Sequence, residues 1–279
     1  MKRSARAADA APAPKRRAAE PRGFAIERGC VTAAELALLR AEADFLAADS
    51  PPTFENGCVL DFLASAPLSD GHAARTSAPA YVALRYAERD AFGAAHRAAV
   101  ERLLFRTLPT VALRHARAGL GVRARRAYLF NEHYVVKPRR SDIEFRWHTD
   151  EAEQLAICAC AGARATAGPY VSLWLALDDV DRENGCLRVR GEADGAPAAA
   201  AGDDAGVPLV LRAGDAVAFS SRLWHRSGAN TSARPRRAFY AQYSFDPITM
   251  GGAPLRLAIL CDSAEPPDAP AYLAESDTR

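Results

Sequence analysis

This 279-residue sequence lacks several features that mark other protein classes. It has no uninterrupted apolar run of about 18 residues, so we expect no membrane-spanning helix. Its six cysteines include no C-x-x-C pair, and a chain of this length can bury a core without disulfides. We therefore expect reduced thiols in an intracellular protein. It contains no G-x-S-x-G motif, which argues against a serine hydrolase.

An excess of charge is also missing. The formal net charge is +2, so the chain as a whole lacks the basic footprint of nucleic-acid-binding proteins, and we expect no direct contact with nucleic acid. The charge is uneven, however, because residues 1–23 hold seven basic and two acidic side chains. This segment is rich in Ala, Pro and Arg and has no apolar periodicity. We expect a disordered basic tail.

The basic tail leaves the compartment open between three interpretations. A basic pair at residues 2–3 and a basic triplet at 15–17 have the spacing of a bipartite nuclear localisation signal. An organelle transit peptide is a second interpretation, which the acidic residues and prolines of the tail weaken. A plain solvated tail is the third. We expect a cytoplasmic or nuclear protein, with the nuclear signal at 2–17, and organelle transit stays open.

The sequence after the tail is predicted to begin with helices. Thr32-Ala-Ala-Glu35 is a capping box, and the apolar positions after it predict a helix over about 33–48. A second helical zone covers about 78–106, and a short helix is expected after Pro109. We treat residues 24–120 as a helical preface that forms an N-terminal layer.

After Gly121 the sequence changes to short runs that are rich in β-branched and aromatic residues. Strands are predicted at 127–137, 169–177, 186–190, 208–211, 215–220 and 237–244. Helices followed by many short strands indicate an α+β protein with a sandwich or barrel. We predict one domain over 24–261, with a β core at 121–250, followed by a loose C-terminal tail at 262–279.

The stretch F-R-W-H-T-D, residues 145–150, places His148 two positions before Asp150. Residues two apart on a strand share a face, so an imidazole and a carboxylate could converge on one ion. A further histidine would complete the two-histidine, one-carboxylate triad of non-haem Fe(II) oxygenases, which leaves about three positions open. The tripeptide alone is a weak signal. By the same alternation, Phe145 and Trp147 are expected on the face opposite His148.

Among the other five histidines, His225 is the best candidate for the third ligand. His72, His96 and His115 lie in the helical or loop-rich half without a partner motif, and we expect the last two on helix surfaces. His133 lies on the strand before H-x-D, where packing in the sheet is its simplest role. His225 follows a predicted strand, whose end could bring it to His148 across the mouth of a barrel.

Arg236 lies eleven residues after His225, at the start of the next predicted strand. A guanidinium is a rigid, permanently charged fork that suits bidentate binding of a carboxylate. A metal with open positions and a buried arginine beyond it would bind a dicarboxylate end to end. The simpler interpretation is a solvated basic cluster, because arginines also stand at 234 and 237.

Three blocks in this order, H-T-D, S-L-W-L-A-L-D-D-V-D-R-E-N-G-C-L and G-D-A-V-A-F-S-S-R-L-W-H-R-S-G-A-N-T-S-A-R-P-R-R-A, together resemble the phytanoyl-CoA dioxygenase family. The likeness is close over about 127–246. It implies a double-stranded β-helix, a cupin-like jelly-roll barrel with an N-terminal helical layer. It also implies a dioxygenase that uses Fe(II), 2-oxoglutarate and O2 to hydroxylate a C–H bond of a small molecule, with release of succinate and CO2.

The resemblance also assigns roles to residues of these blocks. It implies three iron ligands: His148, Asp150 and His225. Arg236 and Ser227 would contact the distal carboxylate of 2-oxoglutarate, and Trp174 would line that pocket, although Ser227 could be a turn residue and Trp174 a core residue. No catalytic residue beyond the metal ligands is implied. Since related halogenases lack the carboxylate ligand, Asp150 favours hydroxylation.

Several features leave the substrate and the oligomeric state unassigned. The family's usual P-G-S-H after E-N-G-C-L is replaced by R-G-E-A-D-G and an alanine-rich loop, 191–206, and a second loop, 150–168, follows H-x-D. Residues 131, 133 and 137 share one face of a predicted strand, and this face either lines the pocket or has a structural role in the sheet. The alternatives to a dioxygenase are a cupin-like metal protein that works without 2-oxoglutarate and a non-catalytic interaction module.

Overall fold

The computed structural model describes ten segments of the chain: residues 23–49, 58–62, 77–87, 89–152, 165–166, 169–191, 206–246, 249–250, 253–254 and 259–261. The predicted tails and most of the two loops at 150–168 and 191–206 lie outside these segments, so the predictions for them stay predictions. Within the described residues no helix is long and apolar enough to cross a membrane. The four described cysteines form no disulfide.

Helical segments are described within the predicted helical preface. They are α1 (Ala33–Asp49), α3 (Ala78–Arg85), α4 (Ala94–Arg102), the π-helical segment η1 (Leu103–Thr107) and α5 (Leu108–Gly119). The backbone N–H of Thr32 donates to Glu35 and the N–H of Glu35 donates to the Thr32 hydroxyl, so the predicted capping box starts α1. The zone predicted at 78–106 is not one helix: it holds α3, α4 and most of η1, and turns separate α3 from α4.

All strand pairs are antiparallel. The large sheet has the order β1 (Phe24–Glu27), β9 (Ala216–Ser220), β6 (Val171–Ala176), β11 (Arg236–Ser244), β3 (Tyr128–Lys137) and β14 (Ile259–Leu260), with β2 (Val59–Leu60) also on β3. A second sheet has the order β4 (Phe145–His148), β10 (Trp224–Ser227), β7 (Leu187–Arg190) and β8 (Val207–Pro208). A third joins β13 (Ala253–Pro254), β12 (Thr249–Met250) and β5 (Ala165–Thr166).

The strands within the predicted helical preface are a correction to the prediction. Residues 24–27 form the edge strand β1, which pairs with β9, and residues 59–60 form β2 on β3. A strand of two to four residues carries too little periodicity to be seen in sequence, and only its partner strand stabilises it. The strand predicted at 208–211 is also shorter than expected, because β8 ends at Pro208.

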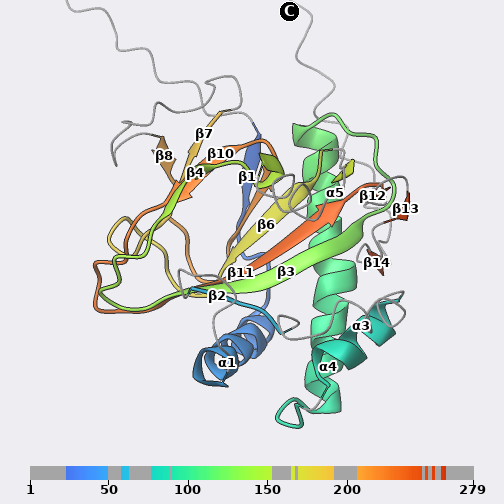
Figure 1. Ribbon diagram of the computed structural model, residues 1–279, viewed down its shortest axis with the longest axis horizontal. Helices are drawn as coiled ribbons and strands as arrows, with labels where there is room; N and C mark the ends of the chain where they lie inside the picture. Colours follow the sequence, from blue (N-terminus) through green and yellow to red (C-terminus); the bar gives the residue numbers. More distant parts are fainter. Residues whose placement is uncertain are drawn as a thin grey trace, which may run out of the picture.

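Helices cover one face of the large sheet, and the four-stranded sheet lies over the other face (Figure 1). Side chains of the central strands alternate between the two layers, as period two requires. Leu173, Leu175 and Phe239 pack with the helices, whereas Trp174 and Tyr240 pack between the sheets. The protein is therefore the predicted mixture of helices and antiparallel sheets, and the space between the two sheets receives every second residue of β6 and β11.

A buried polar cluster fastens the helical layer to the large sheet. Arg85 of α3 pairs with Glu42 of α1 (2.8 Å) and with Glu132 of β3 (2.8 Å). Glu42 also accepts hydrogen bonds from Tyr134 (2.5 Å) and contacts His96 Nε2 (2.7 Å). Because these charges lie away from water, each is tolerated only through its partners. The cluster therefore makes the packing of the helices on the sheet depend on the ionised Glu42.

Acidification is expected to weaken this cluster. Burial alone would raise the pKa of Glu42, but Arg85 and hydrogen bonds from His96, Tyr134 and Tyr86 lower it from 4.5 to about 2. Since the folded pKa is the lower one, the ionised carboxylate stabilises the fold above pH 4.5, and this contribution disappears as the pH falls toward 2. Between pH 7 and pH 3.5 we expect the free energy of unfolding to fall by about 1 kcal/mol through this group, measured by urea unfolding.

The control for this prediction is Glu42→Gln, which removes the titrating group and keeps its shape. This variant should be less stable than the parent at pH 7, because Arg85 loses one of its two carboxylate partners. Its unfolding free energy should nevertheless fall less steeply with acid. Equal acid slopes for the two proteins would contradict the role given to Glu42.

Candidate metal and co-substrate site

The predicted metal ligands converge at one end of the small sheet. His148 ends β4 and lies opposite His225 of β10, and one ligand atom each from His148, Asp150 and His225 lies within 4.8 Å of the other two. The prediction assumed that the strand continues to Asp150, but β4 ends at His148. Asp150 begins a helical stretch, of which residues 150–152 are described, and the backbone N–H of Glu151 donates to the Ser221 carbonyl (3.0 Å). Helical backbone, not strand alternation, therefore presents the carboxylate to the histidines.

Hydrogen bonds to the backbone set the tautomer of both histidines. His148 Nδ1 lies 2.7 Å from the Arg146 carbonyl, and His225 Nδ1 lies 3.0 Å from the Leu223 carbonyl. A carbonyl only accepts, so each Nδ1 carries the proton and each Nε2 carries the lone pair. Burial, and next the neighbouring His148, lower the pKa of His225 to about 4. The neutral imidazole that a metal needs is therefore the stable form.

The two oxygens of Asp150 have different surroundings. Oδ1 lies 3.6 Å from His225 Nε2, on the side of the other two candidate ligands. Oδ2 accepts hydrogen bonds from the hydroxyls of Tyr240 and Ser172, which lie on the neighbouring strands β11 and β6. Sequence reasoning missed both hydroxyls. The only signal was their position on strand faces that point between the sheets.

A second part of the site is a pair of buried cations, Arg236 and Lys137, that face each other on β11 and β3. The Nη2 of Arg236 donates hydrogen bonds to Ser227 Oγ (3.0 Å) and to the Gly185 carbonyl (3.3 Å). Lys137 donates to the same Oγ (2.6 Å) and to the carbonyls of Ser227 and Gly228. Neither cation forms a salt bridge within the described residues, where Arg236 Nε and Nη1 also have no hydrogen-bond partner.

This pair is an incomplete arrangement that an anion would complete. Burial, and next the charge of Arg236, lower the pKa of Lys137 to about 7, and burial lowers the pKa of Arg236 to about 10. Both pKa values are lowered because burial destabilises the charged form of each side chain and no carboxylate among the described residues forms a salt bridge with either one. The Arg236 guanidinium lies 5.2 Å from the ring centre of Trp174, which adds a cation–π contact and covers one side of the pair.

A model of the phytanoyl-CoA dioxygenase (PhyH) family matches residues 19–238 of this chain. The chain belongs to the phytanoyl-CoA dioxygenase family. Since the match covers most of the described residues, including His148, Asp150, His225 and Arg236, the resemblance carried by the three sequence blocks is confirmed. No curated protein matches the chain.

Solved structures agree with this family and show the fold. AviO1 from Streptomyces viridochromogenes Tue57 is 21% identical, with 84% of this chain and 93% of that chain covered and a TM-score of 0.52. The α-ketoglutarate-dependent epimerase SnoN of nogalamycin biosynthesis is 18% identical, with 89% and 94% covered and a TM-score of 0.53. The corresponding carbocyclase, SnoK, is 17% identical, with 86% and 92% covered and a TM-score of 0.55. SnoN has also been crystallised with Fe3+, α-ketoglutarate and nogalamycin RO.

The remaining histidines of this PhyH chain lie elsewhere, and two of them correct the prediction. His115 was expected on a helix surface but is buried in α5, and His96 contacts the buried Glu42. Their helices face the core with more of their circumference than the sequence pattern suggested. His133 does face the space between the sheets, where its ring stacks on Tyr240 at 4.9 Å. His72 lies outside the described residues.

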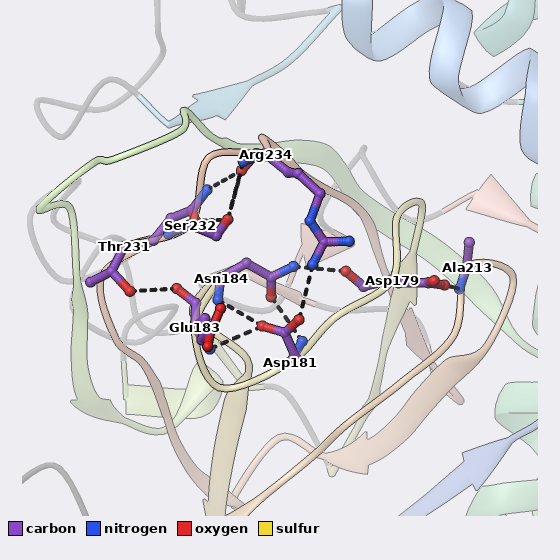
Figure 2. A network of polar contacts seen from close by, with 9 residues as sticks. Asp179, Asp181, Glu183, Asn184, Ala213, Thr231, Ser232 and Arg234 are labelled. Atoms are coloured by element: carbon purple, nitrogen blue, oxygen red, sulfur yellow. Dashed lines mark hydrogen bonds and ion pairs between the residues drawn. The ribbon is translucent and has the colours of Figure 1, made fainter.

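The family turn E-N-G-C-L is held by a polar network (Figure 2). Asp181 accepts the backbone N–H groups of Glu183 and Asn184 (both 2.9 Å) and pairs with Arg234 (3.0 Å). Thr231 donates to the Glu183 carbonyl (3.0 Å), which ties the turn to the loop after β10. The network thereby holds the turn in which the Gly185 carbonyl accepts a hydrogen bond from Arg236.

Gly185 itself requires the absence of a side chain. Its φ of +78° lies in the left-handed region, and a Cβ there would collide with the carbonyl oxygens of Gly228 and Ala229. Gly185→Ala should therefore lower the unfolding free energy by about 1–3 kcal/mol, measured by urea titration. Gly93→Ala is the matched control, because a Cβ there meets nothing within 4 Å. Equal stability of the two variants would contradict this account of the turn.

Proposed function

We propose that the chain is an Fe(II)- and 2-oxoglutarate-dependent dioxygenase that hydroxylates a C–H bond of a small molecule and releases succinate and CO2. One observation carries the proposal: the His-Asp-His cluster and the buried cation pair lie in the same space between the sheets. Ser227, which touches both cations, lies two residues after His225 on β10, so the two share a strand face roughly 7 Å apart. A dicarboxylate could span that distance.

The donor set at the metal position fits Fe(II). Two imidazole nitrogens and one carboxylate oxygen would form a facial triad and would leave about three coordination positions open for co-substrate and O2. When bound, the iron would supply the oxidative chemistry with O2, which no side chain can perform. The ligand residues would be His148, Asp150 and His225, and the intact carboxylate favours hydroxylation over halogenation.

The cation pair would bind the distal carboxylate of 2-oxoglutarate. Arg236 would use its two partnerless nitrogens, Nε and Nη1, and Lys137 would add a second positive charge. Ser227 would hold the two cations side by side, and the Trp174 ring would exclude water from one flank. An arginine buried with two unsatisfied donors argues against the alternatives, a metal protein that does not use 2-oxoglutarate and a non-catalytic module.

The proposal extends to the architecture around the site. We propose that the two facing sheets form the double-stranded β-helix of this enzyme, with its β core over 121–250. That core would lie within a single domain over 24–261. The strand pairs on both sides of the site and the shared inter-sheet core support this arrangement.

The test is anaerobic titration of the protein with Fe(II) and 2-oxoglutarate. Chelation of iron by the 2-oxo acid should produce a charge-transfer band in the visible, and admission of O2 should bleach it and yield succinate. Glutarate is the control, because it keeps both carboxylates and lacks the oxo group that chelates. Absence of both the band and succinate would overturn the proposal.

A further inference from the structure

We infer that Tyr240 and Ser172 are positioning residues, which hold Asp150 so that only its Oδ1 binds the metal. The inference rests on the proposed function. Both hydroxyls donate to Oδ2 and both residues are buried, while Oδ1 lies on the side of His225 Nε2 (3.6 Å). Oδ1 is thus left free to bind the metal, whereas Oδ2 is hydrogen-bonded to the large sheet.

The direction of the protons follows from a longer chain of hydrogen bonds. An ionised carboxylate only accepts, so the protons of Tyr240 and Ser172 must point at Asp150. Gln242 supplies the complement, because its amide nitrogen donates to Ser172 Oγ (3.2 Å) and to the Tyr240 hydroxyl (3.3 Å). Asn131 donates to the Gln242 amide oxygen (2.9 Å) and so fixes which end of that amide faces the hydroxyls. Every hydrogen bond in this series is therefore donated in the direction of the Asp150 carboxylate.

The Tyr240 ring is itself held on several sides. It lies on the central strand β11, between Trp174 of β6 and His133 of β3. His133 stacks on the ring at 4.9 Å with an interplanar angle of 24°, and Phe219 lies 6.2 Å away at a tilt. The hydroxyl therefore has little freedom to leave Asp150, and the buried His133 acquires a role as its lateral support.

A fixed carboxylate matters because a rotating one could chelate. If both oxygens of Asp150 bound one ion, they would occupy two positions and leave too few for a bidentate 2-oxo acid and O2. Two hydrogen bonds on Oδ2 oppose this binding mode and preset Oδ1 at the metal position. Removing such support from a ligand typically weakens metal binding by about 10- to 100-fold.

The experiment compares two tyrosines on the same strand. Tyr240→Phe removes the hydroxyl at Asp150, whereas Tyr243→Phe removes a buried hydroxyl that donates to the Leu104 carbonyl (2.8 Å) on the opposite face. Binding of Mn(II) is measured by titration calorimetry without 2-oxoglutarate, together with thermal unfolding of the metal-free proteins. We expect similar small losses of Tm for both variants. Only Tyr240→Phe should bind Mn(II) about 10- to 100-fold more weakly than the parent.

Adding Ser172→Ala to Tyr240→Phe should weaken Mn(II) binding further, since Oδ2 then loses both of its hydroxyl donors. If Tyr240→Phe bound Mn(II) as tightly as the parent, or if Tyr243→Phe were equally impaired, the positioning role would be overturned while the proposed function stood. A parent protein that bound no metal would overturn both.

Discussion

His225→Ala is expected to abolish the charge-transfer band and to lower succinate formation at least about 1,000-fold, the largest effect of any single substitution considered. The residue supplies one of the three candidate ligands found among the described residues, and its Nε2 is presented by a fixed tautomer on a paired strand. Its neighbours offer no replacement, because Asp150 already forms the cluster with His148 and the nearby His133 stacks on Tyr240. The measurement is the anaerobic spectrum, followed by succinate after O2 is admitted.

The control for this result is another buried histidine. His115 lies in α5, on the far side of the large sheet from the metal position, and His115→Ala should keep the full band. It is a better control than His133, which supports the Tyr240 ring. Thermal unfolding of both variants distinguishes loss of a ligand from loss of the fold. A normal band in His225→Ala would exclude this histidine as a ligand.

Arg236→Ala is expected to weaken 2-oxoglutarate binding by about 100- to 1,000-fold while leaving Mn(II) binding unchanged. Removal of one partner from a buried, hydrogen-bonded charge pair costs about 2–5 kcal/mol, and here two nitrogens, Nε and Nη1, would be lost to the ligand. Lys137 would remain as the only cation, and burial lowers its pKa to about 7, so it is less completely charged at neutral pH. Titration of the Mn(II)-loaded protein with 2-oxoglutarate measures the effect.

The adjacent arginine provides the matched control. Arg237 points to the other face of β11, where its guanidinium pairs with Asp178 (2.8 Å) and with Asp44 (2.7 Å). Arg237→Ala should lower the unfolding free energy by about 1 kcal/mol, as for a partly exposed ion pair, and leave 2-oxoglutarate binding within about two-fold. If the two variants bound 2-oxoglutarate equally well, the carboxylate site would lie elsewhere.

Much of the fold and of the site followed from the sequence alone. Strands were predicted at 169–177 and 237–244, and the structure has β6 (Val171–Ala176) and β11 (Arg236–Ser244) there. The three blocks identified the family, which the family comparison confirms. These features are local, or are fixed by spacing along the chain, so the order of residues is sufficient to reveal them.

The register between β4 and β10, and the end of β4 at His148, could not be predicted from local sequence patterns. Phe145 was expected on the face opposite His148, yet the register between β4 and β10 shifts, so Phe145 lies opposite Ser227 and His148 opposite His225. Because Ser227 and His225 share a face, Phe145 and His148 do too. An extra residue in one strand of a pair interrupts alternation, and its position depends on the partner strand, which the sequence does not name.

The sequence by itself determined which side chains are candidates for binding a metal and a dicarboxylate, because these proposed roles depend on residue type and spacing. Only the tertiary structure decided how they are held. Lys137 joins Arg236, and Tyr240 and Ser172 reach Asp150, through contacts between residues that lie 22 to 99 positions apart in sequence. A polar group that is buried must form a hydrogen bond with whichever group lies near it in the folded protein. Because that partner can come from any part of the chain, no periodic sequence pattern predicts it.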